Sequence, residues 1–221
     1  MKRTRRLLTA VAATLLLATA GHTAYSALGP AVAAGSGDKV LYLTFDDGPG
    51  DETVEILDLL REHDAKAVFF ALGQNLARHT DLGRRIVAEG HVLANHTWSH
   101  EDLTTLDASG RDQTLGDTAE LLDGLGSDSR CVRPPYGATA DAVADELTAR
   151  GMPQVLWTVD TADWTRPGTD AIVSSLLESQ SGDVVLMHDG GSDRTQTVEA
   201  LRVALPKLAA AGYTFAVVPG C

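Results

Sequence analysis

The stretch Val40-Leu41-Tyr42-Leu43-Thr44-Phe45-Asp46-Asp47-Gly48-Pro49 carries the clearest structural signal in this chain. Its first four residues are apolar, and an apolar run bounded by Gly-Pro predicts a strand buried on both faces of a parallel sheet. Loops at the carboxyl ends of such strands hold the chemistry of α/β proteins. Asp46 and Asp47 stand at this end, and neighbouring acids repel each other unless a cation or a base lies between them. The stretch therefore suggests a metal site, although a solvated Asp-Asp turn would also account for these residues alone.

Strand-like and helix-like segments alternate along the rest of the chain. Strands are expected at residues 40–43, 67–71, 92–94, 131–132, 155–159, 184–187 and 213–218. Helices are expected at residues 51–63, after 71 to about 90, from 107 to the 124–126 region, at 139–150, from about 169, and at 195–211. Asp51 and Asp107 are expected to cap two of these helices, and Pro206 to kink the last one or start a new turn. Repeated β-α units with short links predict one α/β domain around a parallel sheet, open or closed into a barrel.

A second chemical cluster is Asn95-His96-Thr97-Trp98-Ser99-His100. Histidines at positions i and i+4 share one face of a helical turn, and both could bind one metal ion. No glutamate follows His96, so a general base must come from elsewhere, and the Asp46-Asp47 pair can supply it. One carboxylate and two imidazoles would leave open positions for water and substrate, as in catalytic zinc sites. The alternative is two surface histidines at the start of a helix.

Three later segments each follow or end an expected strand, so all of them can meet at one face of the domain. They are Arg133-Pro134-Pro135-Tyr136-Gly137, Asp160-Thr161-Ala162-Asp163-Trp164 and Leu186-Met187-His188-Asp189. Each is weak alone, because a Pro-Pro-Tyr-Gly turn or a histidine after an apolar run is usually structural.

Taken with residues 44–49 and 96–100, these segments resemble the polysaccharide deacetylases, carbohydrate esterase family 4 or NodB-homology domain. The resemblance covers about Lys39 to Val218 and includes five motifs in order, with no catalytic position substituted. It implies an α/β fold of the distorted, incomplete (β/α) barrel type. It also implies a metal-dependent hydrolase that removes N-acetyl groups, cutting amide but not peptide bonds, from N-acetylglucosamine polysaccharide such as peptidoglycan or chitin oligomers.

The resemblance also implies a role for each matching residue. The expected metal ligands are Asp47, His96 and His100, with zinc as the metal and cobalt or another divalent ion as alternatives. Asp46 is the expected general base, paired with Arg133, and His188 is the expected acid, oriented by Asp163. The backbone N–H of Tyr136 is expected to bind the oxyanion. Trp164 and Leu186 are expected to line the acetyl pocket.

Other functions remain open on the sequence alone. An O-acetyl esterase acting on acetylated xylan would use the same residues. A metal-binding or sugar-binding module without activity would be expected to have replaced Asp46 or His188, and both are present. A two-metal phosphoesterase would need additional bridging carboxylates. The loops at residues 73–80, 101–109 and 165–169 have no readable substrate code, but their shortness suggests an open groove.

The first 33 residues are expected to be an export signal. Four cations precede an apolar stretch, Leu7 to Ala20, that is shorter than the roughly 20 residues a spanning helix needs, and Ala31-Val32-Ala33 offers a cleavage site. Arg5-Arg6 resembles part of a twin-arginine signal. We expect a linker at 34–38, a deacetylase domain at 39–221 and secretion to the cell wall or envelope. An uncleaved membrane anchor is the alternative.

The net charge of the mature domain indicates which partners it can bind. Removing the signal takes away the cations Lys2, Arg3, Arg5 and Arg6 and no acid, which changes the net charge from −12 to −16. So acidic a domain is a poor match for nucleic acid or an anionic membrane. We expect an acetylated polysaccharide substrate and a monomer without stable membrane association after cleavage.

The chain has two cysteines, Cys131 and Cys221. In an exported protein an even count suggests one disulfide rather than a redox or zinc motif. The alternative is two unrelated free thiols.

Overall fold

The structure is a computed structural model that describes residues 39–221. The predicted signal at 1–33 and linker at 34–38 lie outside the described residues. Strand β1 (Lys39–Asp46) is the centre of a six-stranded parallel sheet in the order β3-β2-β1-β5-β4, with β6 beside the start of β1. The other strands are β2 (Ala67–Ala71), β3 (Val92–Asn95), β4 (Val159–Asp160), β5 (Val184–His188) and β6 (Tyr213–Phe215).

The predicted barrel-like closure is visible at the edge of this sheet. Single parallel bridges join Asn95 to Val132 and Val132 to Gln154, and β4 follows Gln154 after a short link and pairs with β5. Backbone pairing therefore continues from β3 through Val132 to Gln154, a few residues before β4. This arrangement matches the expected distorted, incomplete (β/α) barrel.

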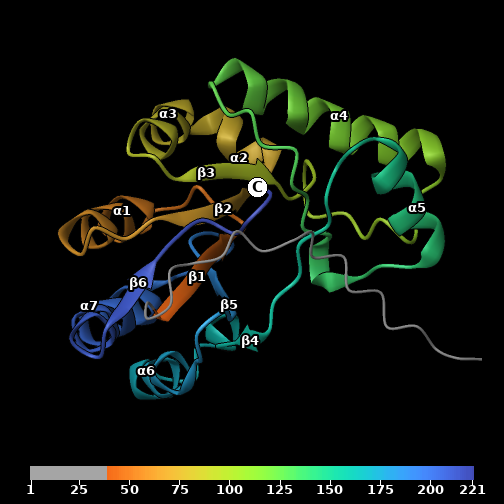
Figure 1. The fold of residues 1–221 in the computed structure, drawn as a ribbon. Coiled ribbons are helices and arrows are strands. Elements are labelled where there is room, and N and C mark those ends of the chain that lie inside the picture. The colour runs from red at the N-terminus through yellow and green to blue at the C-terminus, as the bar shows by residue number, and fades with distance from the viewer. Residues whose placement is uncertain (1–38) are drawn as a thin grey trace, which may run out of the picture.

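Helices cover the outside of the sheet (Figure 1). They are α1 (Thr53–Glu62), α2 (Gly73–Arg78), α3 (Thr80–Ala88), α4 (Ala108–Gly124), α5 (Asp141–Ala149), α6 (Thr169–Glu178) and α7 (Thr195–Ala210), with 3-10 turns η1 (Pro135–Gly137) and η2 (Asp163–Thr165). An outer row α6-α7-α1-α3 forms because each helix packs on the next. No helix within residues 39–221 is long and apolar enough to cross a membrane.

Successive side chains of β1 point alternately toward the hydrophobic core and toward the candidate site. Leu41, Leu43 and Phe45 are fully buried in the main core, together with α1 and α7. Thr44 and Asp46 point to the opposite face, because successive side chains of a strand alternate. This opposite face is the inside of the incomplete barrel, where the proposed chemistry lies.

Several predicted boundaries were wrong. Residues 155–158 do not form a strand, because the carbonyls of Val155 and Leu156 accept hydrogen bonds from the Arg133 guanidinium. The expected strand at 131–132 is reduced to the two bridges, and the last strand ends at Phe215. The segment after β2 forms two helices, α2 and α3, with a break at His79.

Helix caps gave a mixed result. Asp107 caps α4, since its carboxylate accepts from the N–H of Gly110 at 2.8 Å. Asp51 does not cap α1, which begins at Thr53 after Glu52 without a side-chain cap. The hydroxyl of Thr53, the first residue of α1, instead accepts a hydrogen bond from the N–H of Gly50. Helix α7 continues through Pro206 as one helix.

The two cysteines form a disulfide, as predicted. The bond joins Cys131 to Cys221, whose Cα atoms lie 5.3 Å apart, across 90 residues of sequence. It fastens the end of the chain to the segment that leads into Arg133. Cys131 also belongs to a small apolar cluster with Val68, Phe70 and Ala94 on the inner face of the sheet.

Candidate metal centre and active site

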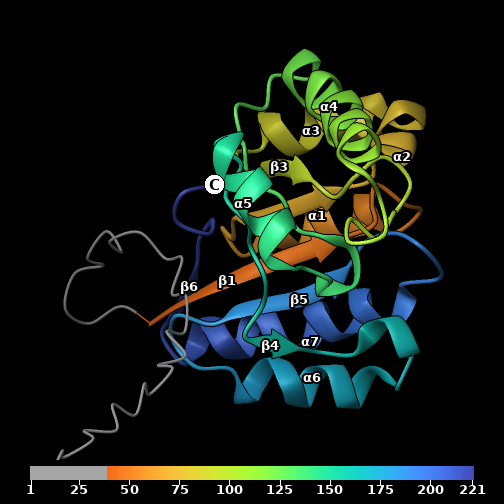
Figure 2. The same cartoon turned by 90° about the vertical axis from the view of Figure 1, so that its right-hand side faces the viewer.

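The candidate site lies at the carboxyl ends of the parallel strands. Asp46 ends β1, His96 follows β3 and His188 ends β5. Register brings them together, because Asp46 pairs with His188 on one side and with Phe70 of β2 on the other. Figure 2 shows β1 and β5 pointing the same way beside α7. Residues more than a hundred positions apart therefore meet at one edge.

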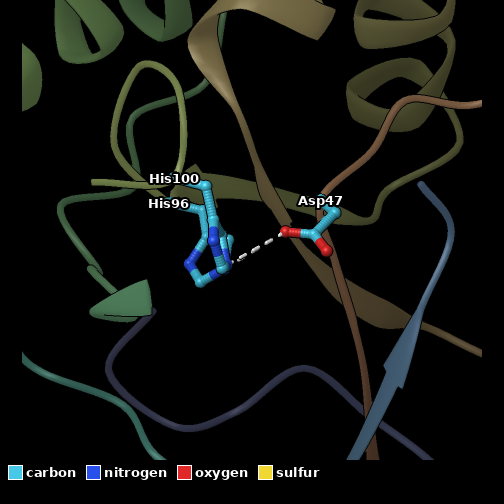
Figure 3. A group of neighbouring side chains, drawn as sticks. All are labelled: Asp47, His96 and His100. Carbon is cyan, nitrogen blue, oxygen red and sulfur yellow. Dashed lines mark ion pairs between the residues drawn. The ribbon is translucent and has the colours of Figure 1, made fainter. Parts of the chain in front are cut away.

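Asp47, His96 and His100 form a group that could hold a metal ion (Figure 3). Asp47 Oδ1 lies 3.5 Å from Nε2 of His96 and 3.5 Å from Nε2 of His100. Ligands bound to zinc in tetrahedral geometry lie about 3.3 Å from one another, so this spacing fits one shared cation. Within residues 39–221 the buried Asp47 Oδ1 has no hydrogen-bond donor, which fits an oxygen kept free for a metal.

The protonation of the two imidazoles also suits a metal. His96 Nδ1 lies 2.6 Å from the carbonyl oxygen of Arg133, which can only accept, so Nδ1 carries the proton and Nε2 keeps its lone pair. Burial lowers the pKa of His100 below its ordinary value, against the opposing effect of the Asp47 charge. A neutral ring can donate its lone pair to a cation.

The two histidines lie on a loop, so the expected helical turn was wrong. Thr97 and His100 have φ angles of 67° and 68°, in the left-handed region. Side chains enforce this path, because Asn95 Oδ1 accepts from the N–H of Thr97 and Thr97 Oγ1 accepts from the N–H of His100. The loop, rather than helical spacing, brings the two Nε2 atoms to Asp47.

Glu101 braces the same loop. Its carboxylate accepts hydrogen bonds from the backbone N–H and hydroxyl of Ser99 and from the hydroxyl of Thr114 on α4. Burial alone would raise the pKa of Glu101, but these hydrogen bonds lower it to about 2. Glu101 is therefore charged at neutral pH and joins the ligand loop to α4.

Asp46 and Arg133 form a buried ion pair. The Arg133 side chain is wholly buried, and its NH1 donates to Asp46 Oδ1 at 2.7 Å and to the hydroxyl of Thr44 at 2.8 Å. Its guanidinium lies over the ring of Phe70 at 4.2 Å, a favourable cation–π contact. Burial lowers the pKa of Arg133, and Asp46 opposes that effect. The other oxygen of Asp46, Oδ2, lies 3.7 Å from His96 Nε2 and so faces the metal group.

His188 and Asp163 form a second pair. His188 Nδ1 lies 2.7 Å from Asp163 Oδ1, and Asp163 Oδ2 accepts from the backbone N–H of His188 and from the hydroxyl of Thr197. Burial alone would lower the pKa of His188, but the hydrogen bond and charge of Asp163 raise it above its ordinary value. The carboxylate therefore fixes the ring and leaves Nε2 free.

The three residues predicted to contact substrate have different surroundings. Tyr136 is 70% exposed, has a φ of 61°, and its ring meets that of His100 edge to face with centroids 4.4 Å apart. Trp164 is 57% exposed and follows Asp163 in η2. Leu186 is buried in β5, on the same face of the strand as His188.

Sequence reasoning missed most of the supporting residues. Glu101 and Thr114 are ordinary polar residues in the sequence, and nothing marks them before the loop is folded. Asn95 and Thr97 stood inside the histidine cluster, where a Ser, Thr or Asn beside a predicted ligand could have been interpreted as a backbone-binding residue. Asp189 follows His188 directly and could have been noticed for that reason.

Comparisons with known proteins find relatives over most of the chain. The family model described as polysaccharide deacetylase matches residues 33–155. A chitooligosaccharide deacetylase of Rhizobium leguminosarum bv. trifolii is 39% identical over 206 residues, covering 84% of this chain and 93% of that protein. A peptidoglycan-N-acetylglucosamine deacetylase of Bacillus cereus is 37% identical over 185 residues, covering 82% and 87%.

A solved structure is similar over the same region. The crystal structure of a peptidoglycan N-acetylglucosamine deacetylase bound to an N-hydroxybenzamide superposes with a TM-score of 0.78. It is 35% identical and covers 83% of this chain and 87% of that one. Family model, relatives and fold agree over most of the chain, which therefore belongs to the polysaccharide deacetylase family.

Proposed function

We propose that this chain is a metal-dependent deacetylase that removes N-acetyl groups from N-acetylglucosamine-containing polysaccharide. The observation that carries the proposal is that one edge of the sheet holds a three-residue metal group, a buried carboxylate–arginine pair and a histidine–carboxylate pair. Amide hydrolysis needs these three functions: an electrophile for the carbonyl, a base for water and an acid for the amine. The named activities of the relatives support the same reaction.

Asp47, His96 and His100 would hold the metal, and zinc suits their one oxygen and two nitrogen ligands. When bound, the ion supplies Lewis-acid chemistry, since it polarises the acetyl carbonyl and lowers the pKa of water at the site. Three protein ligands leave room for water and substrate.

Asp46 is the proposed general base. Arg133 holds its Oδ1 at 2.7 Å, so Oδ2 is the oxygen left to take a proton from the attacking water. Because Arg133 and Asp46 are both buried, the pair keeps a fixed geometry and shields the base from bulk water. Attack of water oxygen on the acetyl carbon produces a tetrahedral oxyanion.

His188 is the proposed acid. The carbon–nitrogen bond breaks as His188 Nε2 gives a proton to the departing amine, and acetate is left. Asp163 raises the pKa of His188 against the effect of burial, which keeps the proton available. The backbone N–H of Tyr136 is the proposed donor to the oxyanion, and it has no acceptor among residues 39–221. Trp164 and Leu186 are the proposed walls of the acetyl pocket.

The substrate is proposed to be peptidoglycan or chitin oligomers. Exposed Tyr136 and Trp164 at the rim suit the apolar faces of sugar rings. The signal-like first 33 residues support export to the cell wall or envelope, where such polymers occur, with an uncleaved anchor as the alternative.

The test is acetate release by zinc-loaded residues 34–221 from chitin oligomers, peptidoglycan and acetylated xylan, measured side by side. We expect release from an N-acetylglucosamine polymer, loss of activity with a chelator, and recovery with Zn²⁺ or Co²⁺. Asp46→Asn is the matched inactive control. Release from acetylated xylan alone would contradict the proposed N-deacetylation and indicate an O-acetyl esterase.

A further inference from the structure

A buried carboxyl group with no part in the proposed chemistry lies behind the turn that carries Asp47. Asp189 follows His188 at the end of β5 and is 1% exposed. Its backbone N–H donates to the carbonyl of Asp46 at 3.1 Å. Its Oδ2 accepts from the Thr53 hydroxyl at 2.7 Å, and that hydroxyl accepts from the N–H of Gly50 at 2.8 Å. Asp189 and Thr53 therefore fasten both ends of the turn formed by residues 46–50.

Glycines allow the two segments to pack without a gap. A Cβ at Gly48 would overlap the Asp189 carboxyl group, and a Cβ at Gly190 would overlap the carbonyl of Asp47. At Gly191 a Cβ would lie 2.9 Å from Asp47 Oδ2. Residues 189–191 therefore enclose the backbone and the outer carboxylate oxygen of Asp47.

Asp47 needs such support because its backbone is strained. Its φ of 70° is in the left-handed region, which is unfavourable for a residue other than glycine and persists where the surroundings enforce it. From the other side the Asn75 side chain donates to the carbonyl of Asp47 at 2.8 Å. This conformation is the one that turns Asp47 Oδ1 toward both imidazoles.

Within the described residues the Asp189 side chain makes one hydrogen bond, from the Thr53 hydroxyl to Oδ2. Asp189 Oδ1 has no hydrogen-bond partner among the described residues. Burial raises the pKa of Asp189 to about 7, the Thr53 hydrogen bond opposes this, and the charges of Asp47 and Asp46 add to it. Asp189 therefore supports the turn through its volume, which fills the space beside Gly48, and through its hydrogen bond to Thr53.

We propose that Asp189, together with Thr53, is a positioning residue that holds Asp47 in its left-handed conformation, so that the carboxylate meets His96 and His100 in the geometry a metal requires. The inference rests on the proposed function in that Asp47 is taken as a metal ligand. It assigns Asp189 a role in metal affinity rather than in proton transfer.

The test is a competition titration with Zn²⁺ on residues 34–221, which measures metal affinity without any activity assay. Asp189→Ala should bind zinc about 10–100-fold more weakly, the usual cost of losing a residue that orients a ligand. Asp189→Asn should stay within about threefold of the unsubstituted protein, because it keeps the volume and an acceptor for Thr53.

Thr53→Val is the second variant and decides the matter if Asp189→Ala does not fold. Its matched control is Ser127→Ala, because the Ser127 hydroxyl also donates to one buried acceptor, the carbonyl of Leu93, and accepts from one N–H, that of Ser129. Thr53→Val should weaken zinc binding, and Ser127→Ala should not.

Zinc binding by Asp189→Ala equal to that of the unsubstituted protein would overturn the inference. Equal weakening in Asp189→Asn and Asp189→Ala would also overturn it, because the charge would then matter. Failure of the unsubstituted protein to bind zinc would instead contradict the proposed function.

Discussion

Asp46 and Asp47 are neighbours in the sequence, but their carboxylates have different surroundings. Arg133 binds one oxygen of Asp46 at 2.7 Å, whereas Asp47 Oδ1 faces two imidazoles and has no donor among the described residues. The backbone makes the difference, because Asp46 ends β1 in extended form and Asp47 takes a φ of 70°. Two adjacent acids can therefore serve as base and ligand.

This division predicts two distinct phenotypes. Asp47→Asn should lose zinc affinity, because an amide oxygen carries no charge to offset the cation. Asp46→Asn should keep zinc but lose at least about a hundredfold in rate, since a positioned proton-transfer group contributes roughly 10²–10⁴. Metal content by elemental analysis, read beside acetate release, checks both. Equal loss of zinc in the two variants would indicate a bridging pair of carboxylates instead.

The His188–Asp163 pair predicts a pH effect. An acid must be protonated to work, so activity is lost as the pH rises through the pKa of His188. Asp163 raises that pKa against the effect of burial. Asp163→Asn removes the charge and should move the alkaline limb of the kcat/KM profile to lower pH. An unchanged alkaline limb, with lower kcat/KM at every pH, would assign Asp163 a structural role alone.

At the scale of elements, the loop of residues 96–101 is the part of the site most dependent on side-chain bonds. Glu101 accepts three hydrogen bonds and links Ser99 to Thr114 of α4. Glu101→Gln places an amide group against donors, so we expect zinc affinity to fall about tenfold, within the range typical of groups that orient metal ligands. Zn²⁺ competition measures it.

Asp102→Asn is the control for that variant. Asp102 is the next residue, and among residues 39–221 its carboxylate accepts hydrogen bonds from Thr104 alone, through the backbone N–H and the hydroxyl. Its zinc affinity should match that of the unsubstituted protein. If Asp102→Asn and Glu101→Gln weakened zinc equally, the effect would come from the net charge rather than from the brace.

Apolar pattern and motif order were enough to predict the parallel sheet and to gather the site residues at one edge. β1 and β2 were recognisable because buried parallel strands are continuous apolar runs. The segment 155–158 was not, because its carbonyls bind the Arg133 side chain rather than a strand. The histidine loop was misassigned because its positive φ angles depend on Asn95 and Thr97, whose bonds follow no periodicity.

At the scale of the whole molecule, the parallel sheet brings residues that are far apart in the sequence close together in space. Asp46 and His188 are register partners although they belong to the first and the fifth strand. Arg133 follows Val132, which pairs with Asn95 of β3 and with Gln154 through single bridges, so the position of Arg133 depends on fewer backbone bonds than a strand would provide. The disulfide adds a covalent tie close to that segment.

The Cys131–Cys221 bond therefore predicts an effect on stability. It closes a loop of 90 residues, and in the chain-entropy model such a loop contributes about 4–5 kcal/mol, less any strain in the folded state. The double variant Cys131→Ala/Cys221→Ala should unfold at a lower denaturant midpoint, and its m-value should be no smaller than that of the oxidised protein, because the unfolded chain without the crosslink exposes at least as much surface. Unreduced protein should weigh about two hydrogens less than reduced protein, as oxidation of one thiol pair requires.

Zinc binding serves as the internal comparison for that variant. Neither cysteine belongs to the group of Asp47, His96 and His100. Cys131 precedes Arg133 by two residues, and its carbonyl accepts from the N–H of Asn95 at 3.0 Å, a backbone bond that Cys131→Ala keeps. We therefore expect the double variant to keep its zinc affinity and to lose rate. Arg133 positions the proposed base Asp46 rather than the metal ligands. A variant with unchanged midpoint and unchanged rate would mean that the sheet alone holds Arg133 in place, and that the disulfide adds nothing to the fold or to the site.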